Sequence, residues 1–292
     1  MKTKINLVLV FALLSVSTSS IIARFLPDVS AVVISFWRLA IAGFLVWIYT
    51  AFYRQGHIDK SNYKLYVFSG FFLALHFASF YGAVKFTSIA NATLLGITAP
   101  MFTILYERLF LKRTLKPLML LGVLFALCGS LIIASSGFVL KDGSFYGKLL
   151  GVLAAFSIAM VYISANKLRI SSNTISYTRM LYTVAAIFLF LMSIIIGESI
   201  FSINSTDIVW LVGLGLVPTI LGHSLFYYAI KYTSPTIIAS VPLGEPIIAS
   251  ILAWILFSER VSSITLAGGI LILFGVYFII ANSSRAHLTD NY

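Results

Sequence analysis

The chain has 292 residues, enough for two soluble domains, but 60% of them are hydrophobic and only 10% are charged. This composition, with a mean hydropathy of +1.02, excludes an ordinary soluble fold and predicts an all-α polytopic membrane protein. The net charge of +11 comes from short loops between apolar segments rather than from a long basic run. We therefore expect a lipid bilayer as a partner and no nucleic acid.

Ten apolar segments follow one another along the chain, each close to the roughly 20 residues that a helix needs to cross a membrane. They cover residues 5–24, 30–53, 64–84, 88–110, 117–136, 146–166, 174–197, 207–230, 236–257 and 264–282. Two lysines precede the first segment, as in a signal peptide, but its apolar stretch is long enough for a full crossing, and we expect it to be retained. The loops are too short to hold a separate domain.

The lysines and arginines of the loops are divided unequally between the two sides of the membrane. The side that holds the N-terminus carries thirteen: Lys2, Lys4, Arg54, Lys60, Lys64, Arg108, Lys112, Arg113, Lys116, Lys167, Arg169, Lys231 and Arg285. The other side carries five: Arg24, Lys85, Lys141, Lys148 and Arg260. Because positively charged loops stay in the cytoplasm, we expect both termini there and the protein in the inner or plasma membrane.

The second half of the chain repeats the first. The motif FYxAxKxTS at residues 80–88 returns at residues 226–234, an offset of 146 that also aligns Pro100 with Pro246. We therefore expect two repeats of five helices, residues 1–140 and 141–292. Since five is odd, the second repeat enters the membrane from the opposite side, as in secondary transporters whose sites lie near the midplane between inverted repeats.

Glu245 and His223 are the strongest candidates for function. Each lies about 11 residues from the polar segment 231–235, which puts both roughly 16 Å deep, near the membrane centre. A carboxylate there costs about 3 kcal/mol or more on insertion scales, and the repeat places Ala99 at the matching position. Glu245 is either a proton-binding or substrate-ammonium-binding acid, or a neutral or histidine-paired residue that caps broken backbone. His223 is either its partner, a substrate contact, or a neutral packed histidine.

Other polar and aromatic side chains are candidates to line a central cavity: Trp37, Arg38, His76, Asn91, Thr98, Thr219 and Tyr227. Arg38 is either a site for a substrate carboxylate or a side chain that snorkels to the interface. His76 shares the midplane, but a packed neutral histidine explains it as well. The hydroxyl and amide groups either face a cavity or join helices by hydrogen bonds.

Pro100, Pro218, Pro242 and Pro246 lie inside predicted spans and are candidate hinges or kinks. Proline removes a backbone N–H group and clashes with the preceding turn, so nearby carbonyls lose their partners. Such groups at mid-membrane are tolerated only against protein or a water-filled cavity.

The sequence contains no nucleophile–base pair, metal-ligand cluster or nucleotide-binding motif. We therefore expect no enzymatic activity, no metal and no cofactor. Cys128 is the only cysteine and lies in an apolar span. We expect it to be a small, buried packing residue.

Several short motifs together resemble those of a known family: Trp37-Arg38, Ala99-Pro100, Gly222-His223, Glu245-Pro246, Ser258-Glu259-Arg260, and the glycines at 268, 269 and 275. Over essentially the whole chain they look like the EamA-type transporters of the drug/metabolite transporter superfamily. The resemblance implies ten helices in two inverted five-helix repeats around a central cavity, usually for export of small solutes. One departure is Lys112-Arg113, where the family's first half often has a glutamate.

We therefore expect a secondary transporter, or a facilitative exporter, of small metabolites such as amino acids. It would work by alternating access, with protons as a candidate coupling ion. Two alternatives stay open: an intramembrane enzyme with His223 and Glu245 as an acid/base pair, and a non-transporting membrane scaffold. The sequence indicates neither a particular substrate nor an oligomeric state.

Overall fold

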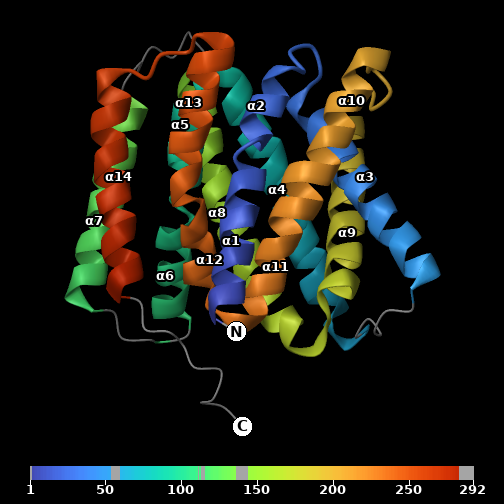
Figure 1. Cartoon of the computed structure of the whole chain (residues 1–292), viewed down its shortest axis with the longest axis horizontal. Helices are drawn as coiled ribbons and strands as arrows, with labels where there is room; N and C mark the ends of the chain where they lie inside the picture. Colours follow the sequence, from blue (N-terminus) through green and yellow to red (C-terminus); the bar gives the residue numbers. More distant parts are fainter. Residues whose placement is uncertain (1, 54–59, 111, 113–115, 136–143, 283–292) are drawn as a thin grey trace.

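The computed structural model describes residues 2–53, 60–110, 112, 116–135 and 144–282, and every regular element in these ranges is a helix. Eight helical segments are long and apolar enough to cross a membrane, and two shorter apolar helices, Pro117–Ile133 and Ser263–Ile279, bring the number to ten. The prediction of an all-α protein with ten spans is confirmed. Figure 1 shows these helices side by side in one bundle.

The first five spans contain α1 (Lys2–Val16), α2 (Ser19–Arg24), α3 (Ala31–Phe52), α4 (Tyr63–Phe86), α5 (Ile89–Gly96), α6 (Ala99–Leu109) and α7 (Pro117–Ser135). A short 3₁₀ turn, Lys60–Asn62, precedes α4. The other five spans contain α8 (Ser144–Ser171), α9 (Thr174–Ile195), α10 (Ser205–Leu214), a π-helical segment Gly215–His223, α11 (Ser224–Ala229), α12 (Pro235–Ser240), α13 (Glu245–Phe257) and α14 (Ser263–Asn282). Two 3₁₀ turns, Ile230–Tyr232 and Val241–Gly244, follow α11 and α12. We call the end of the bundle where α1 begins the N face, and the other end the far face (Figure 1).

The fourth and ninth spans are interrupted at matching positions. The fourth breaks at Ile97 and Thr98, between α5 and α6, and the ninth breaks at Val241–Gly244, between α12 and α13. The offset of 146 carries the first break onto the second. Pro100 stands in the first turn of α6 and Pro246 in the first turn of α13, where proline is tolerated because that N–H has no partner within its helix. A proline in the first turn therefore suits the start of a new helix after each break, at α6 and at α13.

The repeated motif ends at a helix start in both halves. Ser88 caps α5 by accepting a hydrogen bond from the backbone N–H of Asn91 (3.1 Å), and Ser234 caps α12 by accepting one from Ile237 (3.3 Å). Serine favours this position because its hydroxyl satisfies one of the unpaired N–H groups of the first turn. The same local chemistry therefore starts the fourth and the ninth span.

Helices α7 and α14 form a pair at one edge of the bundle (Figure 1). They meet at glycines: a Cβ atom added to Gly122 would lie 2.5 Å from the carbonyl oxygen of Gly275, and one added to Gly129 would clash with that of Gly268. Small residues let two helix backbones approach closely, which is how helices associate in lipid. Cys128 is exposed on α7, so its prediction as a buried residue was wrong. The glycine face, not the cysteine face, packs against α14.

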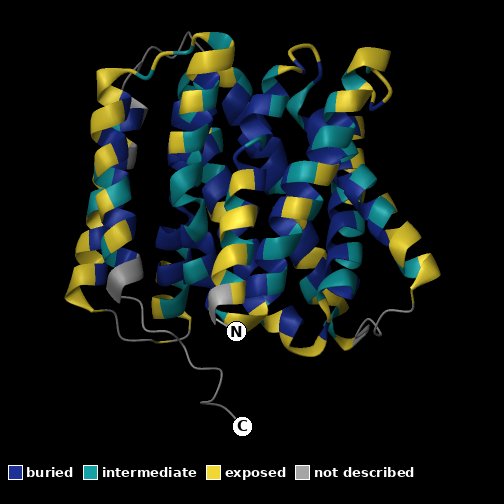
Figure 2. Cartoon of the chain, in the orientation of Figure 1, coloured by how far each residue is buried: buried dark blue, intermediate teal, exposed yellow. Residues whose placement is uncertain are grey.

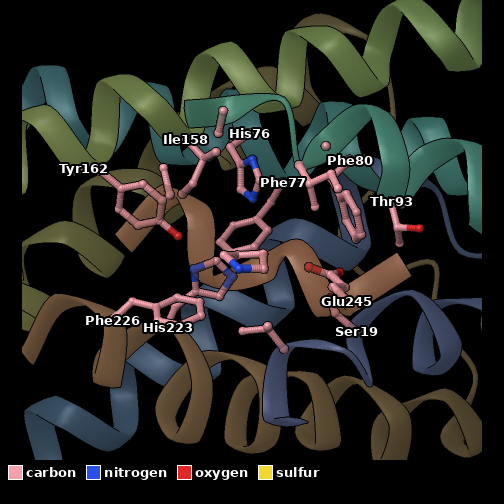
Figure 3. Close-up of a pocket in the computed structure, with 16 residues that line it drawn as sticks. Ser19, His76, Phe77, Phe80, Thr93, Ile158, Tyr162, His223, Phe226 and Glu245 are labelled. Carbon is pink, nitrogen blue, oxygen red and sulfur yellow. The ribbon is translucent and has the colours of Figure 1, made fainter. Parts of the chain in front are cut away.

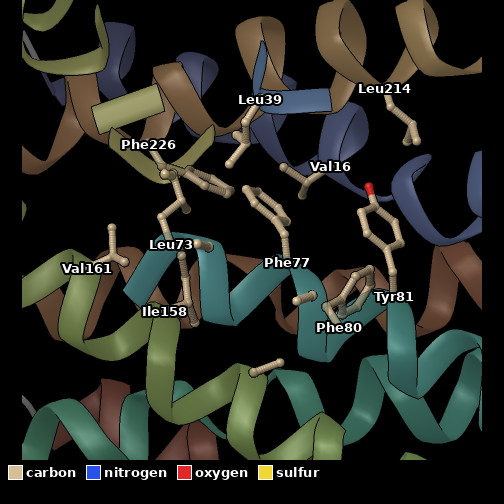
Figure 4. Packing of buried hydrophobic residues seen from close by; sticks show 14 of the residues in the cluster. Val16, Leu39, Leu73, Phe77, Phe80, Tyr81, Ile158, Val161, Leu214 and Phe226 are labelled. Carbon is tan, nitrogen blue, oxygen red and sulfur yellow. The ribbon is translucent and has the colours of Figure 1, made fainter. Parts of the chain in front are cut away.

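Figure 2 shows buried residues on the inner faces of the helices and exposed ones on the outer faces. The core is apolar and aromatic, and many large hydrophobic side chains are exposed on the outside, as expected for a surface covered by lipid. Helix α4 packs against α8 and α9, and α3 packs against α9. Phe77 of α4 is 1% exposed and lies among Val16, Leu39 and Phe226 at the centre (Figure 4). Three different spans therefore meet α4 at the depth where the candidate residues lie.

Candidate substrate site

A cavity lies at the middle of the bundle, between parts of both halves of the chain (Figure 3). Its polar lining is Ser19, His76, Thr93, Tyr162, His223 and Glu245, and the rest of the lining is apolar, glycine or proline. Its volume is about 50 Å³, counted as the space open to the centres of water-sized spheres. At about 15 Å³ per molecule by that measure, this is room for roughly three waters. A larger molecule fits only if the surrounding helices move apart.

Glu245 enters this cavity because the ninth span is interrupted beneath it. The residue follows the 3₁₀ turn Val241–Gly244 and is the first residue of α13, so its carboxylate lies at a helix N-terminus, where negative charge is stabilised. It remains half-buried in the middle of the bundle, since it faces the cavity. Within the described residues its side chain has no hydrogen-bond or ion-pair partner. The carboxylate is therefore available to a proton or a ligand.

His76 of α4 and His223 of the π-helical segment both line the cavity. Their ring centroids are 6.0 Å apart, with the rings edge to face. His76 Nδ1 lies 2.8 Å from the carbonyl oxygen of Ala154, so Nδ1 carries the proton and Nε2 is left to accept. His223 Nδ1 is buried and has no partner. The pair thus presents one fixed and one uncommitted imidazole to the same space.

Arg38 is completely buried one layer behind the cavity wall. Its Nε donates to the hydroxyl of Thr219 (2.6 Å), and its Nη1 donates to the hydroxyls of Ser19 (2.7 Å) and Tyr81. The guanidinium carbon lies 4.0 Å above the ring of Phe77, a cation–π contact. Nη2 has no partner, and no carboxylate of the described residues lies within ion-pair distance. Ser19 and Phe77 separate this cation from the cavity that both of them line.

Arg38 nevertheless bears on the cavity, because Ser19 and Phe77, which contact its guanidinium group, both line it. A buried cation without a counter-ion is costly unless hydrogen bonds or an anion compensate it. The hydroxyl groups around Arg38 and the ring of Phe77 supply part of that compensation.

The structure brings His76, His223 and Glu245 together and places the other cavity candidates elsewhere. Trp37 donates its indole N–H to the carbonyl oxygen of Ile200 (2.7 Å), near the far face. Asn91 accepts from Thr265 (2.8 Å) and donates to Thr87 (3.1 Å), so it joins the fourth span to α14. Thr98 donates to its own helix, at the carbonyl of Leu95 (2.7 Å). These side chains act in packing in this conformation.

Thr219 and Tyr227 lie next to the cavity but are not part of its lining. Thr219 binds Arg38, and the ring of Tyr227 lies 6.3 Å from that of His223. Among the prolines, Pro242 lines the cavity and Pro218 lies inside the π-helical segment. Sequence reasoning missed Ser19, Thr93 and Tyr162, which the cavity contains. Ser19 could have been predicted from the sequence, because it belongs to a run of small residues where the first span breaks.

The described residues contain no group of three or more histidine, cysteine, aspartate or glutamate side chains that could hold a metal ion. A multi-pass helical bundle with interrupted helices around a small polar cavity is an architecture found in membrane transporters. The comparisons with known proteins agree with this class. The model of the EamA-like transporter family matches the chain twice, at residues 3–135 and 145–281, and the chain belongs to this family.

Several similar proteins align with most of the chain. An uncharacterized transporter of Archaeoglobus fulgidus is 23% identical over 98% of this chain and 100% of its own length. The pseudopaline exporter of Pseudomonas aeruginosa is 25% identical over 90% of this chain and 92% of its own. A probable amino-acid metabolite efflux pump of Salmonella typhimurium is 26% identical over 82% and 84%. A crystal structure with 16% sequence identity matches the fold with a TM-score of 0.69 over 96% of this chain and 98% of its own.

Proposed function

We propose that this EamA-family transporter moves a small metabolite by alternating access through the central cavity, as a secondary transporter or facilitative exporter. The observation that carries the proposal is Glu245, a carboxylate in the middle of a membrane bundle that faces a cavity and has no partner among the described residues. An ionisable group at this depth is expensive, and such groups in membrane proteins mark substrate and ion pathways. The names of the relatives, transporters and exporters, support the same class.

The site suits a zwitterionic solute such as an amino acid. Glu245 takes the ammonium group, or a proton when the solute is absent. Arg38 supplies a cation one layer behind the cavity, and a carboxylate reaches its free Nη2 once the wall formed by Ser19 moves. Ser19 stands at the break in the first span, where α1 ends and α2 begins, so this part of the wall has no continuous helix to hold it. The amino-acid metabolite efflux pump among the relatives supports this class of substrate.

Alternating access needs elements that bend, and the breaks in the fourth and ninth spans provide them. In this proposal the repeats 1–140 and 141–292 rock about the cavity, with Pro100, Pro218, Pro242 and Pro246 at the points of bending. The glycine contacts of α7 with α14 hold the two repeats together at one edge. Both termini lie in the cytoplasm in this arrangement. Among the described residues no hydrogen bond joins His223 to Glu245, so the alternative of an acid/base enzyme lacks support.

The proposal is tested with three ligands of one size. Leucine carries both charges, leucinamide lacks the carboxylate, and 4-methylpentanoate lacks the ammonium group. The purified protein should gain thermal stability with leucine and less with either analogue, and the same order should hold for uptake into proteoliposomes. A wider screen of amino acids, nucleosides and vitamins identifies the solute itself. A protein that binds none of these and moves none of them across a liposome membrane contradicts the proposal.

A further inference from the structure

Five buried tyrosines extend from the cavity lining toward the N face: Tyr66, Tyr162, Tyr177, Tyr182 and Tyr227. We call them the tyrosine column. None is more than 2% exposed. They come from α4, α8, α9 and α11, of which α4, α8 and α11 also line the cavity. The column therefore stands where a solute would have to pass between the cavity and the N face.

The rings of the column form a continuous series. Tyr227 follows His223 of the cavity lining at 6.3 Å between ring centroids, Tyr177 follows Tyr227 at 5.3 Å, and Tyr66 follows Tyr177 at 6.1 Å. Tyr66 is the fourth residue of α4 and Tyr177 the fourth residue of α9, so both lie one turn from the N face. The series thus leads from the cavity to the end of the bundle.

The hydroxyl groups of the column are only partly used by the folded protein. Those of Tyr177 and Tyr182 have partners, Ser69 at 3.2 Å and Ser224 at 2.8 Å. Those of Tyr66 and Tyr227 are buried without any partner, as is Nδ1 of His223 beside them. Most buried polar side-chain atoms in proteins are hydrogen-bonded, and phenylalanine would fill the same space without an unpaired hydroxyl. Packing alone does not account for tyrosine at these two positions.

A buried cation lies beside the column. Arg169 of α8 is 2% exposed, and its Nε donates to the backbone carbonyl of Tyr227 at 3.0 Å. Its other donors go to the carbonyl of Ser172 and the hydroxyl of Thr174. All three partners are neutral oxygens, so the positive charge is held next to the column without being neutralised by them.

From this series of rings and unpaired hydroxyls we propose that the tyrosine column is the part of the permeation path between the cavity and the N face, closed in this state. We further propose that its hydroxyls hydrogen-bond a polar solute in transit. The inference rests on the proposed transport function and adds to it the route and its chemistry. A path lined by hydroxyls and one cation selects small hydrogen-bonding solutes, including those with a carboxylate, over apolar ones. In the state described here the rings pack against one another and close the route.

The route is tested by cysteine labelling in the full-length protein with a Cys128→Ala background. Ser69→Cys puts a thiol in the column, and Ser164→Cys puts one on α8, 1% exposed, seven residues from the N-face end of its helix and bonded to its own backbone. An anionic methanethiosulfonate that does not cross lipid is applied from the N face. Only an accessible thiolate reacts, and in this proposal the column opens to the N face during alternating access whereas the packing around Ser164 does not, so Ser69→Cys should be labelled roughly tenfold faster than Ser164→Cys. Equal rates would overturn the assignment of the route.

The role of the hydroxyls is tested by three substitutions that each remove one oxygen. Tyr66→Phe and Tyr227→Phe remove unpaired hydroxyls, so the melting temperature should stay level or rise while the transport rate falls about tenfold. Tyr182→Phe removes a paired hydroxyl and should lower the melting temperature. The proposal is wrong if the melting temperature of Tyr227→Phe falls as far as that of Tyr182→Phe. It is also wrong if Tyr227→Phe transports the solute at the parental rate, because the hydroxyl then does not serve transit. The labelling rate and the melting temperature are both measured without a substrate. They therefore test the column even if the protein carries a different solute from the one proposed above.

Discussion

His76 and His223 meet at the centre of the bundle with their ring centroids 6.0 Å apart, one from each half of the chain. The offset of 146 carries position 76 onto Gly222, the neighbour of His223. The two histidines therefore occupy neighbouring rather than matching repeat positions, and they are not equivalent. His76 is fixed by the carbonyl of Ala154, whereas Nδ1 of His223 has no partner.

This difference predicts opposite effects on stability. His76→Leu leaves the Ala154 carbonyl without its side-chain donor and should lower the free energy of unfolding by about 1 kcal/mol. His223→Leu removes a buried nitrogen that has no partner and should leave stability unchanged or raise it. Thermal unfolding of the two purified variants, measured in the same detergent, checks the prediction. A greater loss for His223→Leu than for His76→Leu would contradict the assignment of the hydrogen bonds.

The glycine contact between α7 and α14 predicts a steric effect. Gly129→Leu places a side chain against the backbone of Gly268, where even a Cβ atom does not fit. Overpacking of this kind costs about 1–3 kcal/mol or more, so we expect a lower melting temperature and a reduced yield of folded protein. Gly213→Ala is the matched control, since a Cβ atom there meets nothing within 4 Å. Similar behaviour of the two variants would show that the pair does not pack through these glycines.

Near the far face, Glu259 links three parts of the chain. One carboxylate oxygen accepts from the backbone N–H of Ile89 (2.6 Å), and the other forms an ion pair with Arg24 (3.4 Å). Glu259→Gln keeps an acceptor for Ile89 and loses only the charge, so it should cost less than about 1 kcal/mol, because partly exposed ion pairs contribute little. Glu259→Ala removes both interactions and should cost more. Unfolding curves that coincide for the two variants would rule out a contribution from the hydrogen bond to Ile89.

The distribution of lysine and arginine predicts the orientation in the membrane. Epitope tags at both ends should be protected from protease added to intact cells, since the loops on the N-terminal side carry thirteen basic residues against five on the other. Disruption of the cells should expose both tags and provides the control. A tag that is cleaved in intact cells places its terminus outside and refutes the predicted topology.

The sequence predicted the fold well because long apolar segments and short polar loops leave a membrane protein few alternatives. It also singled out Glu245 and His223, which line the cavity, because ionisable side chains stand out in apolar spans. It could not predict that Asn91 would bond Thr265 or that Trp37 would bond the Ile200 carbonyl, because such contacts depend on how the helices pack. The five tyrosines of the column are scattered over four helices, and only the folded chain brings them together.

The most direct test of the account is made on Glu245 in proteoliposomes with an imposed pH gradient. Glu245→Gln keeps the size and hydrogen bonding of the side chain but cannot release a proton. We expect this variant to lose gradient-driven accumulation of the transported solute while retaining exchange of labelled for unlabelled solute across the membrane. If Glu245→Gln accumulates the solute as well as the parent protein under the same gradient, coupling through this carboxylate is wrong, and Glu245 serves only the structure of the broken helix.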